Sequence, residues 1–481
     1  MPLYFLQGGR EHGRYGRGLR SADRLLSLKS VFGVAPGVSS GFLPLTLARG
    51  RGALSSSCSS GLSRARGMPP RFALPPHPML TPSPLNMPDT TMPPDAFPAT
   101  NEPLDGSAWR AHFPVCDDLA YLDHASLGPT PRLTARAVAD SLAEQGRRGS
   151  LAHAGLHDIA DATRAEFAAY IGASPDRVAY AANASAAISL IAAGLPWQAG
   201  DEVVVPAIDF PSVVLPWMTL QGRGVRVRTV ACVDGRVDVD ALLAACGAAT
   251  RVMCVSWVQF SSGCRVDLAR LGAACRQRGI LLVVDGVQGV GALRMNVADL
   301  PIDALVVHAY KWMLAPQGVA WLYVGDRLAE RLSLSAAGPR SLTPRDSYFD
   351  HRYEPRAGAA RFETGILGFH GIVGARASLA LLRAAGPARV EGAVLRHAGH
   401  LARGLLDAGC HVQGGADRGD FASGIVVFRH PRHDAATCRQ ALLRAGVVTA
   451  AREGHVRVAA HFYNTDAEIE TLLRTVRDMP A

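Results

Sequence analysis

The chain lacks a clean run of about 20 apolar residues, which is the length that a membrane-spanning helix needs. The nearest candidate, residues 31–48, is uncharged but is interrupted by Pro36, Pro44 and several glycines and serines. We therefore expect no membrane partner. With 481 residues, 48% of them hydrophobic and 19% charged, the composition is that of a globular protein with a large core. It excludes collagen-like, coiled-coil and wholly disordered chains.

The sequence also lacks paired cysteines. Its nine cysteines are scattered, their number is odd, and no CxxC pair occurs, which argues against a disulfide framework and a zinc site. His124, His370 and His461 stand near candidate site segments, but each stands alone, so no metal is expected. Cysteines inside apolar runs are typical of small buried side chains in a reducing compartment. We therefore expect a cytoplasmic protein.

The body of the chain has no excess of charge of either sign. Residues 1–88 contain eleven basic and two acidic residues and so carry the whole formal net charge of +9. Because the rest of the chain is neutral, nucleic acid is not expected as a partner. A small-molecule substrate is expected instead.

Residues 1–103 do not read as folded, since twelve of the 31 prolines fall between Pro69 and Pro103. We interpret this stretch as a disordered or mis-called N-terminal extension. Candidate start residues that precede the body are Met68, Met79, Met87 and Met92. The Arg-, Gly- and Ser-rich composition leaves a transit peptide as an alternative.

From about Trp109 short apolar runs alternate with helical spacing, which indicates a parallel sheet covered on both faces. The runs that read as strands are residues 203–206, 251–258, 280–284, 304–307 and 319–324. After about Pro344 helices prevail, with strands at 424–429 and 455–459. We expect an α/β large domain at 104–345, including an N-terminal arm, and a smaller α+β domain at 346–481.

Lysine is rare in this sequence: Lys29 and Lys311 are the only two among 50 Lys and Arg residues. Lys29 lies in the extension, so Lys311 is the one lysine of the body, and the remaining Lys/Arg positions of the body are all Arg. An Arg can replace a surface lysine, but a guanidinium cannot form an imine. By count alone Lys311 could still be a leftover surface residue, and its neighbourhood decides between the two readings.

Lys311 follows the strand at 304–307 and precedes a turn, which places its amine at the carboxyl end of a strand, where α/β folds bind ligands. Asp285 ends the preceding strand, and a buried carboxylate there needs a cationic partner. A pyridinium nitrogen is such a partner. Pyridoxal 5′-phosphate (PLP) requires both a lysine Schiff base and an acid on its ring nitrogen.

The body resembles the class V aminotransferase family of fold-type I PLP-dependent enzymes, which includes cysteine desulfurases and isopenicillin N epimerase-like proteins. The resemblance runs from Tyr121, in YLDHASLGPTP, to about Thr465. It implies a large domain with a mostly parallel sheet of the seven-stranded type, a smaller C-terminal domain, PLP as the cofactor and a homodimer.

The resemblance implies a role for each matching residue. Lys311 would form the Schiff base and move the substrate α-proton, and Asp285 would keep the ring nitrogen protonated. Gln288 would hydrogen-bond the ring hydroxyl, and Phe210 would stack on the ring where desulfurases have His. The phosphate would be bound by Ala184, Ser185, His308 and Tyr310. Arg457 would grip the substrate carboxylate.

Two departures from the family pattern restrict the reaction. Ile366 stands where relatives have a Thr that reaches the partner subunit's phosphate. Residues 445–456 contain no cysteine, although desulfurases carry a mobile one there. We therefore expect an amino acid or small amine substrate and transamination. Epimerisation of the isopenicillin N epimerase type or a PLP-dependent lyase reaction is the alternative, and a PLP-fold binding module without turnover is the second.

Overall fold

The computed structural model describes residue 104, residues 106–344, residue 347 and residues 349–480. The extension predicted at 1–103, with its candidate start residues, lies outside the described residues. The main sheet has seven strands in the order β2 (Val178–Ala181), β8 (Ala320–Val324), β7 (Ala304–His308), β6 (Leu281–Asp285), β5 (Thr250–Ser256), β3 (Glu202–Pro206) and β4 (Arg226–Val230). Only β8 pairs antiparallel with its two neighbours, so the sheet is mostly parallel, as predicted.

The strands of the main sheet are buried on both faces. In β6, for example, Leu282 and Val284 belong to one apolar cluster and Leu281 and Val283 to the other. Alternate residues of a strand point to opposite faces, so a continuous apolar run is what a sheet covered on both sides requires. This is why the apolar runs in the sequence located these strands.

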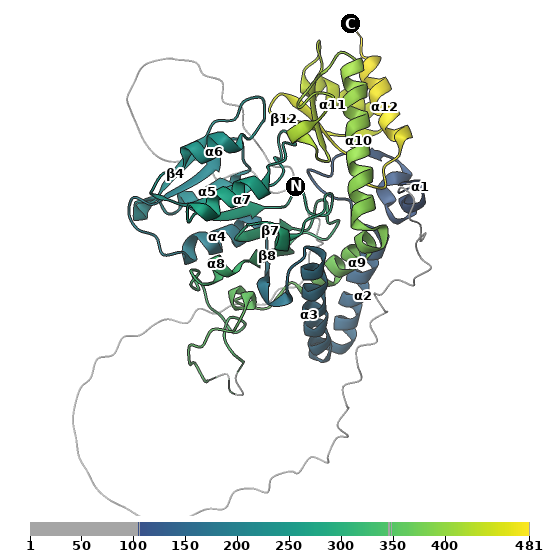
Figure 1. Ribbon diagram of the computed structural model, residues 1–481. Helices are drawn as coiled ribbons and strands as arrows, with labels where there is room; N and C mark the ends of the chain where they lie inside the picture. Colours follow the sequence, from purple (N-terminus) through teal and green to yellow (C-terminus); the bar gives the residue numbers. More distant parts are fainter. Residues whose placement is uncertain (1–103, 105, 345–346, 348, 481) are drawn as a thin grey trace, which may run out of the picture. The chain divides into compact units, whose positions relative to one another are not determined.

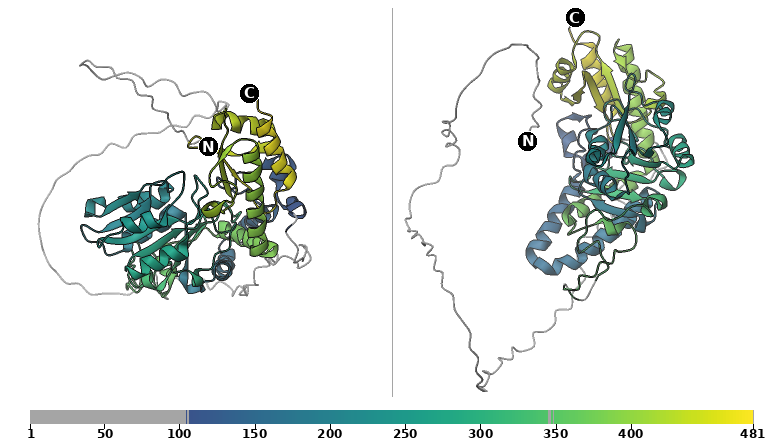
Figure 2. Two further views of the ribbon diagram at one scale, coloured as in Figure 1. Left: turned by 45° about the horizontal axis from the view of Figure 1, so that its top comes forward. Right: turned by 90° about the vertical axis from the view of Figure 1, so that its left-hand side faces the viewer.

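Helices cover both faces of this sheet (Figures 1 and 2). Residues of α4, α5 and α8 pack into one apolar cluster, and residues of α3, α6, α7 and α9 pack into the other. The helices of this part of the chain are α1 (Gly106–Trp109), α2 (Arg132–Arg148), α3 (His153–Tyr170), α4 (Ala184–Gly194), α5 (Pro211–Met218), α6 (Val239–Ala245), α7 (Leu268–Gln277), α8 (Asp326–Ala329) and α9 (Phe369–Ala385).

A smaller antiparallel sheet follows, with the order β12 (Ala450–Arg452), β13 (His455–Ala459), β10 (Ile425–Arg429) and β9 (His411–Val412). It packs against α10 (Pro387–Asp407), α11 (Ala435–Arg444) and α12 (Asp466–Arg477). The N-terminal part of the described chain joins this region, because β1 (Ala120–Tyr121) pairs in parallel with β11 (Val447–Val448). Among the described residues, no helix has the length and apolar character needed to cross a membrane.

Candidate active site

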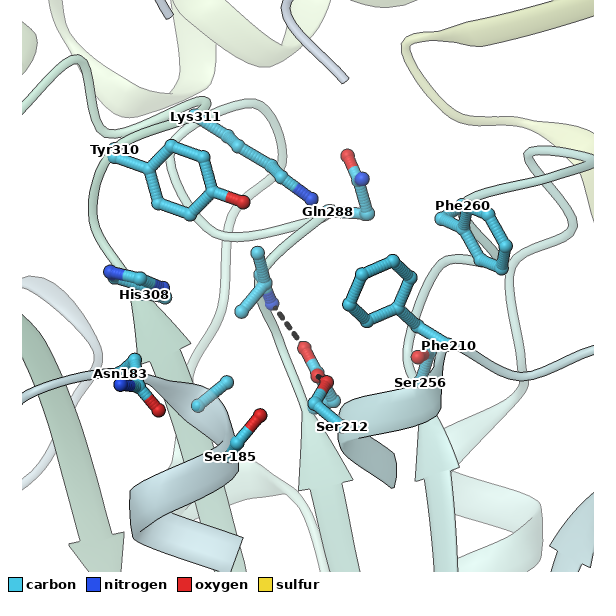
Figure 3. A pocket seen from close by; sticks show the side chains of 13 residues that line it. Asn183, Ser185, Phe210, Ser212, Ser256, Phe260, Gln288, His308, Tyr310 and Lys311 are labelled. Atoms are coloured by element: carbon cyan, nitrogen blue, oxygen red, sulfur yellow. Dashed lines mark hydrogen bonds between the residues drawn. The ribbon is translucent and has the colours of Figure 1, made fainter. Parts of the chain in front are cut away.

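A pocket of about 210 Å³ opens at the carboxyl ends of the central strands of the main sheet (Figure 3). Its wall is built by β5, β6 and β7, by the N-terminus of α4 and by the loop before α5. The lining residues are Asn183, Ala184, Ser185, Phe210, Ser212, Ser256, Phe260, Asp285, Val287, Gln288, His308, Tyr310 and Lys311. All eight predicted cofactor residues are among them, although they come from segments up to 127 positions apart in the chain, from Ala184 to Lys311.

Lys311 follows β7 and its side chain enters the pocket (Figure 3). The residue is 7% exposed, and its amine has no hydrogen bond or ion pair to any described residue. Burial lowers the pKa of this amine to about 8, while the carboxylate of Asp285 acts in the opposite direction. A neutral amine near physiological pH is what nucleophilic attack on a carbonyl requires.

Asp285 lies at the end of β6 and accepts hydrogen bonds from the Val287 amide at 2.9 Å and from the Ser212 hydroxyl at 3.4 Å. Burial raises its pKa to about 6, and the nearby carboxylate of Asp209 adds to this effect. Asp209 is itself buried and accepts hydrogen bonds from Ser256 and from Gln259. The carboxylate of Asp285 is therefore placed where a cationic ligand atom would be strongly favoured.

The opposite side of the pocket suits an anion. Ala184 and Ser185 are the first two residues of α4, so their N–H groups have no intrahelical acceptor. Asn183 caps the helix by accepting from the Ala186 amide at 2.8 Å. His308 lines the same pocket, and its buried Nε2 has no hydrogen-bond partner in the described part of the chain. Burial lowers the pKa of His308 to about 4, so the ring is neutral.

Two aromatic rings form a further part of the wall. The ring centroids of Phe210 and Phe260 are 5.1 Å apart with an interplanar angle of 81°, and the Lys311 amine lies 5.5 Å from the Phe210 centroid. Phe210 is 41% exposed in the wall of the pocket. A flat apolar ligand surface would cover it.

Arg457, on β13, does not line the pocket but reaches its border through Phe260. Its guanidinium donates to the Phe260 carbonyl at 2.8 Å and to the Ser126 hydroxyl at 2.6 Å, and it lies 3.4 Å from the carboxylate of Asp123. The buried Nε of Arg457 has no partner among the described residues. The structure thus places Arg457, the predicted substrate-binding residue, close to the pocket, where its guanidinium already contacts Phe260, Ser126 and Asp123.

These residues fit PLP on observations that concern the chain alone. Among the described residues, the Lys311 amine has no hydrogen bond or ion pair, and Nε2 of His308 has no hydrogen-bond partner. The pocket adds a buried carboxylate, a helix N-terminus and a partly exposed aromatic ring. Sequence reasoning did not assign Phe260, Ser212, Ser256 or Val287 to the site. Ser256 ends β5, Val287 and Phe260 follow strands, and Ser212 lies in the first turn of α5. Many residues of the chain share such positions, so the sequence carries no signal that selects these four.

The family model described as aminotransferase class-V matches residues 120–474 of this chain. The probable cysteine desulfurase of Methanothermobacter thermautotrophicus is 29% identical over 399 residues, which is 77% of this chain and 97% of that protein. The uncharacterized aminotransferase YcbU of Bacillus subtilis is 31% identical over 306 residues (64% and 80%). The isopenicillin N epimerase of Streptomyces clavuligerus is 28% identical over 324 residues (64% and 81%).

The fold agrees with solved structures. A C-DES mutant with glycine covalently linked to its PLP cofactor superimposes with a TM-score of 0.72 at 21% sequence identity, and the match covers 77% of this chain and 99% of that chain. The predicted fold class, α/β of fold type I, is therefore confirmed.

Proposed function

Because this chain belongs to the class V aminotransferase family, we propose that it is a PLP-dependent enzyme that transfers the amino group of an amino acid or small amine. The observation that carries the proposal is the single lysine of the body. It is buried without a hydrogen bond or ion pair to the described residues, in a pocket that also holds a buried carboxylate and a helix N-terminus.

The cofactor is PLP, as the sequence predicted; when bound, it draws electrons away from the carbon that carries the substrate amine. Lys311 would bind it covalently through Nζ. Asp285 would face its ring nitrogen, and Gln288 its ring hydroxyl. Its phosphate would be bound by Ala184, Ser185, His308 and Tyr310, and Phe210 would cover the ring.

Lys311 is also suited to move the proton of the substrate, because a pKa of about 8 allows Nζ to accept and return a proton near neutral pH. Epimerisation needs proton exchange on both faces of one carbon. Phe210 and Phe260, which form the aromatic part of the wall, cannot exchange protons. His308 and Tyr310, which also line the pocket, carry exchangeable protons. The choice of transamination therefore rests on the family match, and an epimerase or lyase reaction is kept as the alternative.

Sulfur transfer from cysteine is disfavoured although relatives carry the name cysteine desulfurase. No cysteine is among the residues that line the described pocket. Cys438, the cysteine nearest in sequence to the segment where desulfurases carry theirs, is buried in α11, and burial raises its pKa to about 11. A thiol with that pKa is not a thiolate at neutral pH.

The proposal extends to a cytoplasmic homodimer whose pocket lies near the subunit interface. Its second alternative, a binding module without turnover, would keep the cofactor but leave every amine unchanged. Retention of Lys311, Asp285 and Arg457 speaks against that alternative, because binding alone does not need all three.

The decisive experiment is the visible absorption spectrum of the purified protein after addition of PLP and removal of the excess by desalting. Wild-type protein should keep a visible band, and Lys311→Ala should not. Amino acids and amines are then added one by one, with the keto product and the pyridoxamine form measured. Amine-dependent conversion to pyridoxamine phosphate supports transamination. Ammonia release supports a lyase, and no retained band in wild type would overturn the proposal.

A further inference from the structure

Trp312 follows Lys311 directly, but its side chain enters the protein instead of the pocket. The indole is fully buried, and its Nε1 donates a hydrogen bond to Oε1 of Gln288 at 2.9 Å. Gln288 does line the pocket, where Figure 3 shows its amide beside the Lys311 amine. Trp312 therefore contacts the pocket residue Gln288 from the protein interior, on the side away from the pocket.

The orientation of the Gln288 amide is fixed by the chemistry of its two partners. An indole N–H can only donate, so it requires the amide oxygen. The carbonyl of Ala125 can only accept, so it requires the amide nitrogen, which donates to it at 2.9 Å. Both partners select the same orientation. In a flipped amide, the nitrogen would face the indole N–H, which is also a donor, and the oxygen would face the Ala125 carbonyl, which is also an acceptor. One N–H of Gln288 then remains without an acceptor among the described residues.

The indole itself is held from two sides. A Cβ atom at Gly424, next to β10, would come within 2.5 Å of Cη2 of the Trp312 ring, so the ring edge fits only against a glycine. The Trp312 carbonyl lies 3.0 Å from Nε2 of His461. The His461 Nδ1 accepts from the Phe462 amide, which leaves the proton on Nε2 for this hydrogen bond. The ring and the backbone carbonyl of Trp312 therefore both contact residues next to strands of the smaller sheet, Gly424 before β10 and His461 after β13.

We propose that Trp312 is a positioning residue, whose indole N–H holds the Gln288 amide with its nitrogen toward the pocket so that the free N–H donates to the ring oxygen of the bound cofactor. This inference rests on the proposed PLP function. It predicts that Trp312 acts only through Gln288. It also predicts an effect on the cofactor that loss of packing alone would not produce.

The test is a pH titration of the visible absorption of the PLP-loaded full-length enzyme. The ring oxygen of PLP stabilises the proton on Nζ of Lys311 when the two are bound. A hydrogen bond donated to that oxygen reduces this stabilisation, so loss of the donor should raise the pH at the midpoint of the titration. Trp312→Phe removes the N–H but keeps an aromatic ring, and we expect its midpoint to rise by up to about one pH unit. Gln288→Leu should raise it at least as much. In the Gln288→Leu background, Trp312→Phe should add no further shift.

Trp321→Phe is the matched control, because Trp321 is equally buried, on β8, and lines no part of the pocket. The control should lower the melting temperature but leave the midpoint unchanged. Equal shifts in both tryptophan variants, or additive shifts in the double variant, would overturn the inference. If Trp312→Phe does not fold, Gly424→Ala, which keeps the indole but displaces its edge, tests the same hydrogen bond. Failure of wild type to retain PLP would refute the proposed function instead.

Discussion

At the scale of single residues, the amine of Lys311 is controlled by burial more than by charge partners. Desolvation lowers its pKa, and the opposing effect of Asp285 only partly compensates. The sequence could single out Lys311, because an arginine-saturated chain makes a lone lysine conspicuous. It could not predict the burial of that lysine, which depends on the packing of segments that meet only in the fold.

Labelling with an amine-reactive reagent should therefore report an unusually acidic lysine. Only the neutral amine reacts, so in apoprotein the rate of Lys311 modification should rise with pH and reach half its maximum near pH 8. Asp285→Asn removes a charge that raises the pKa of the amine, so its midpoint should fall below that of wild type. Mass spectrometry of the peptide gives the rate, and Lys311→Arg serves as the unreactive control. A midpoint near 10.5, the ordinary lysine value, would contradict the burial argument.

Arg457 illustrates a different gap between sequence and structure. The motif around it predicts a carboxylate-binding residue, but it does not reveal that Asp123, 334 positions away, already lies beside the guanidinium. An internal carboxylate in that place competes with the carboxylate of a substrate.

Asp123→Asn should relieve this competition. We expect the KM of amino acid substrates to fall about fivefold, which corresponds to about 1 kcal/mol. Ser126 and the Phe260 carbonyl still hold the guanidinium in place in this variant. The control is an amine substrate without a carboxylate, whose KM should not change. A parallel change in both KM values would show that Asp123 acts on the pocket as a whole.

At the scale of elements, apolar runs located the buried strands β3, β5, β6, β7 and β8 because each is covered on both faces. The edge strand β4 was not identified, because all five residues of its sequence, RVRTV, are exposed or half-buried. The two-residue strands β1 and β11 could not be predicted either. Their pairing joins Ala120 to Val447, and no local pattern encodes such a contact.

The loop between β1 and α2 should be as important for the site as the strands are. Gly128 donates its N–H to the Tyr310 carbonyl at 2.9 Å, and a Cβ at this position would lie 2.1 Å from the Lys311 carbonyl oxygen. Gly128→Ala must therefore displace the lysine loop. We expect a loss of roughly 1–3 kcal/mol of unfolding free energy and weaker PLP retention after desalting.

Gly146→Ala is the matched control for this prediction, because a Cβ at Gly146 in α2 would meet nothing within 4 Å. Denaturant unfolding should show this variant to be more stable by about 0.5–1 kcal/mol, as expected for alanine in a helix interior, with PLP retention unchanged. Retention of PLP by Gly128→Ala at the wild-type level would show that the lysine loop does not depend on this contact.

At the scale of the whole molecule, the described N-terminal segment links the smaller sheet to the pocket. Phe113 stacks on Tyr463 with ring centroids 3.6 Å apart, and β1 then pairs with β11. The same segment continues to Asp123, beside Arg457, and to Ala125, whose carbonyl holds Gln288. Sequence reasoning placed this segment as an arm of the large domain. Its contacts with both regions follow from tertiary packing, which no spacing along the chain displays.

The proposed homodimer can be tested at one exposed apolar side chain, that of Ile366, which is 82% exposed. Its loop is held firmly, because Glu363 is buried and forms ion pairs with Arg164 and Arg340. A cavity of about 730 Å³ lies beside Ile366 and is also lined by residues of α4, the helix whose N-terminus forms part of the pocket. A partner subunit packed here would cover Ile366 and close the cavity beside it.

Ile366→Asp should therefore convert a dimer into a monomer and weaken PLP retention, because a charge buried in an interface is costly. Val233→Asp is the control, since Val233 is 75% exposed but lines a different cavity, and it should leave the assembly intact. Sedimentation velocity measures both. If wild type sediments as a monomer, the homodimer is wrong. If Ile366→Asp remains a dimer, the subunits meet through another surface, and the proximity of the pocket to the interface has to be argued from that surface instead.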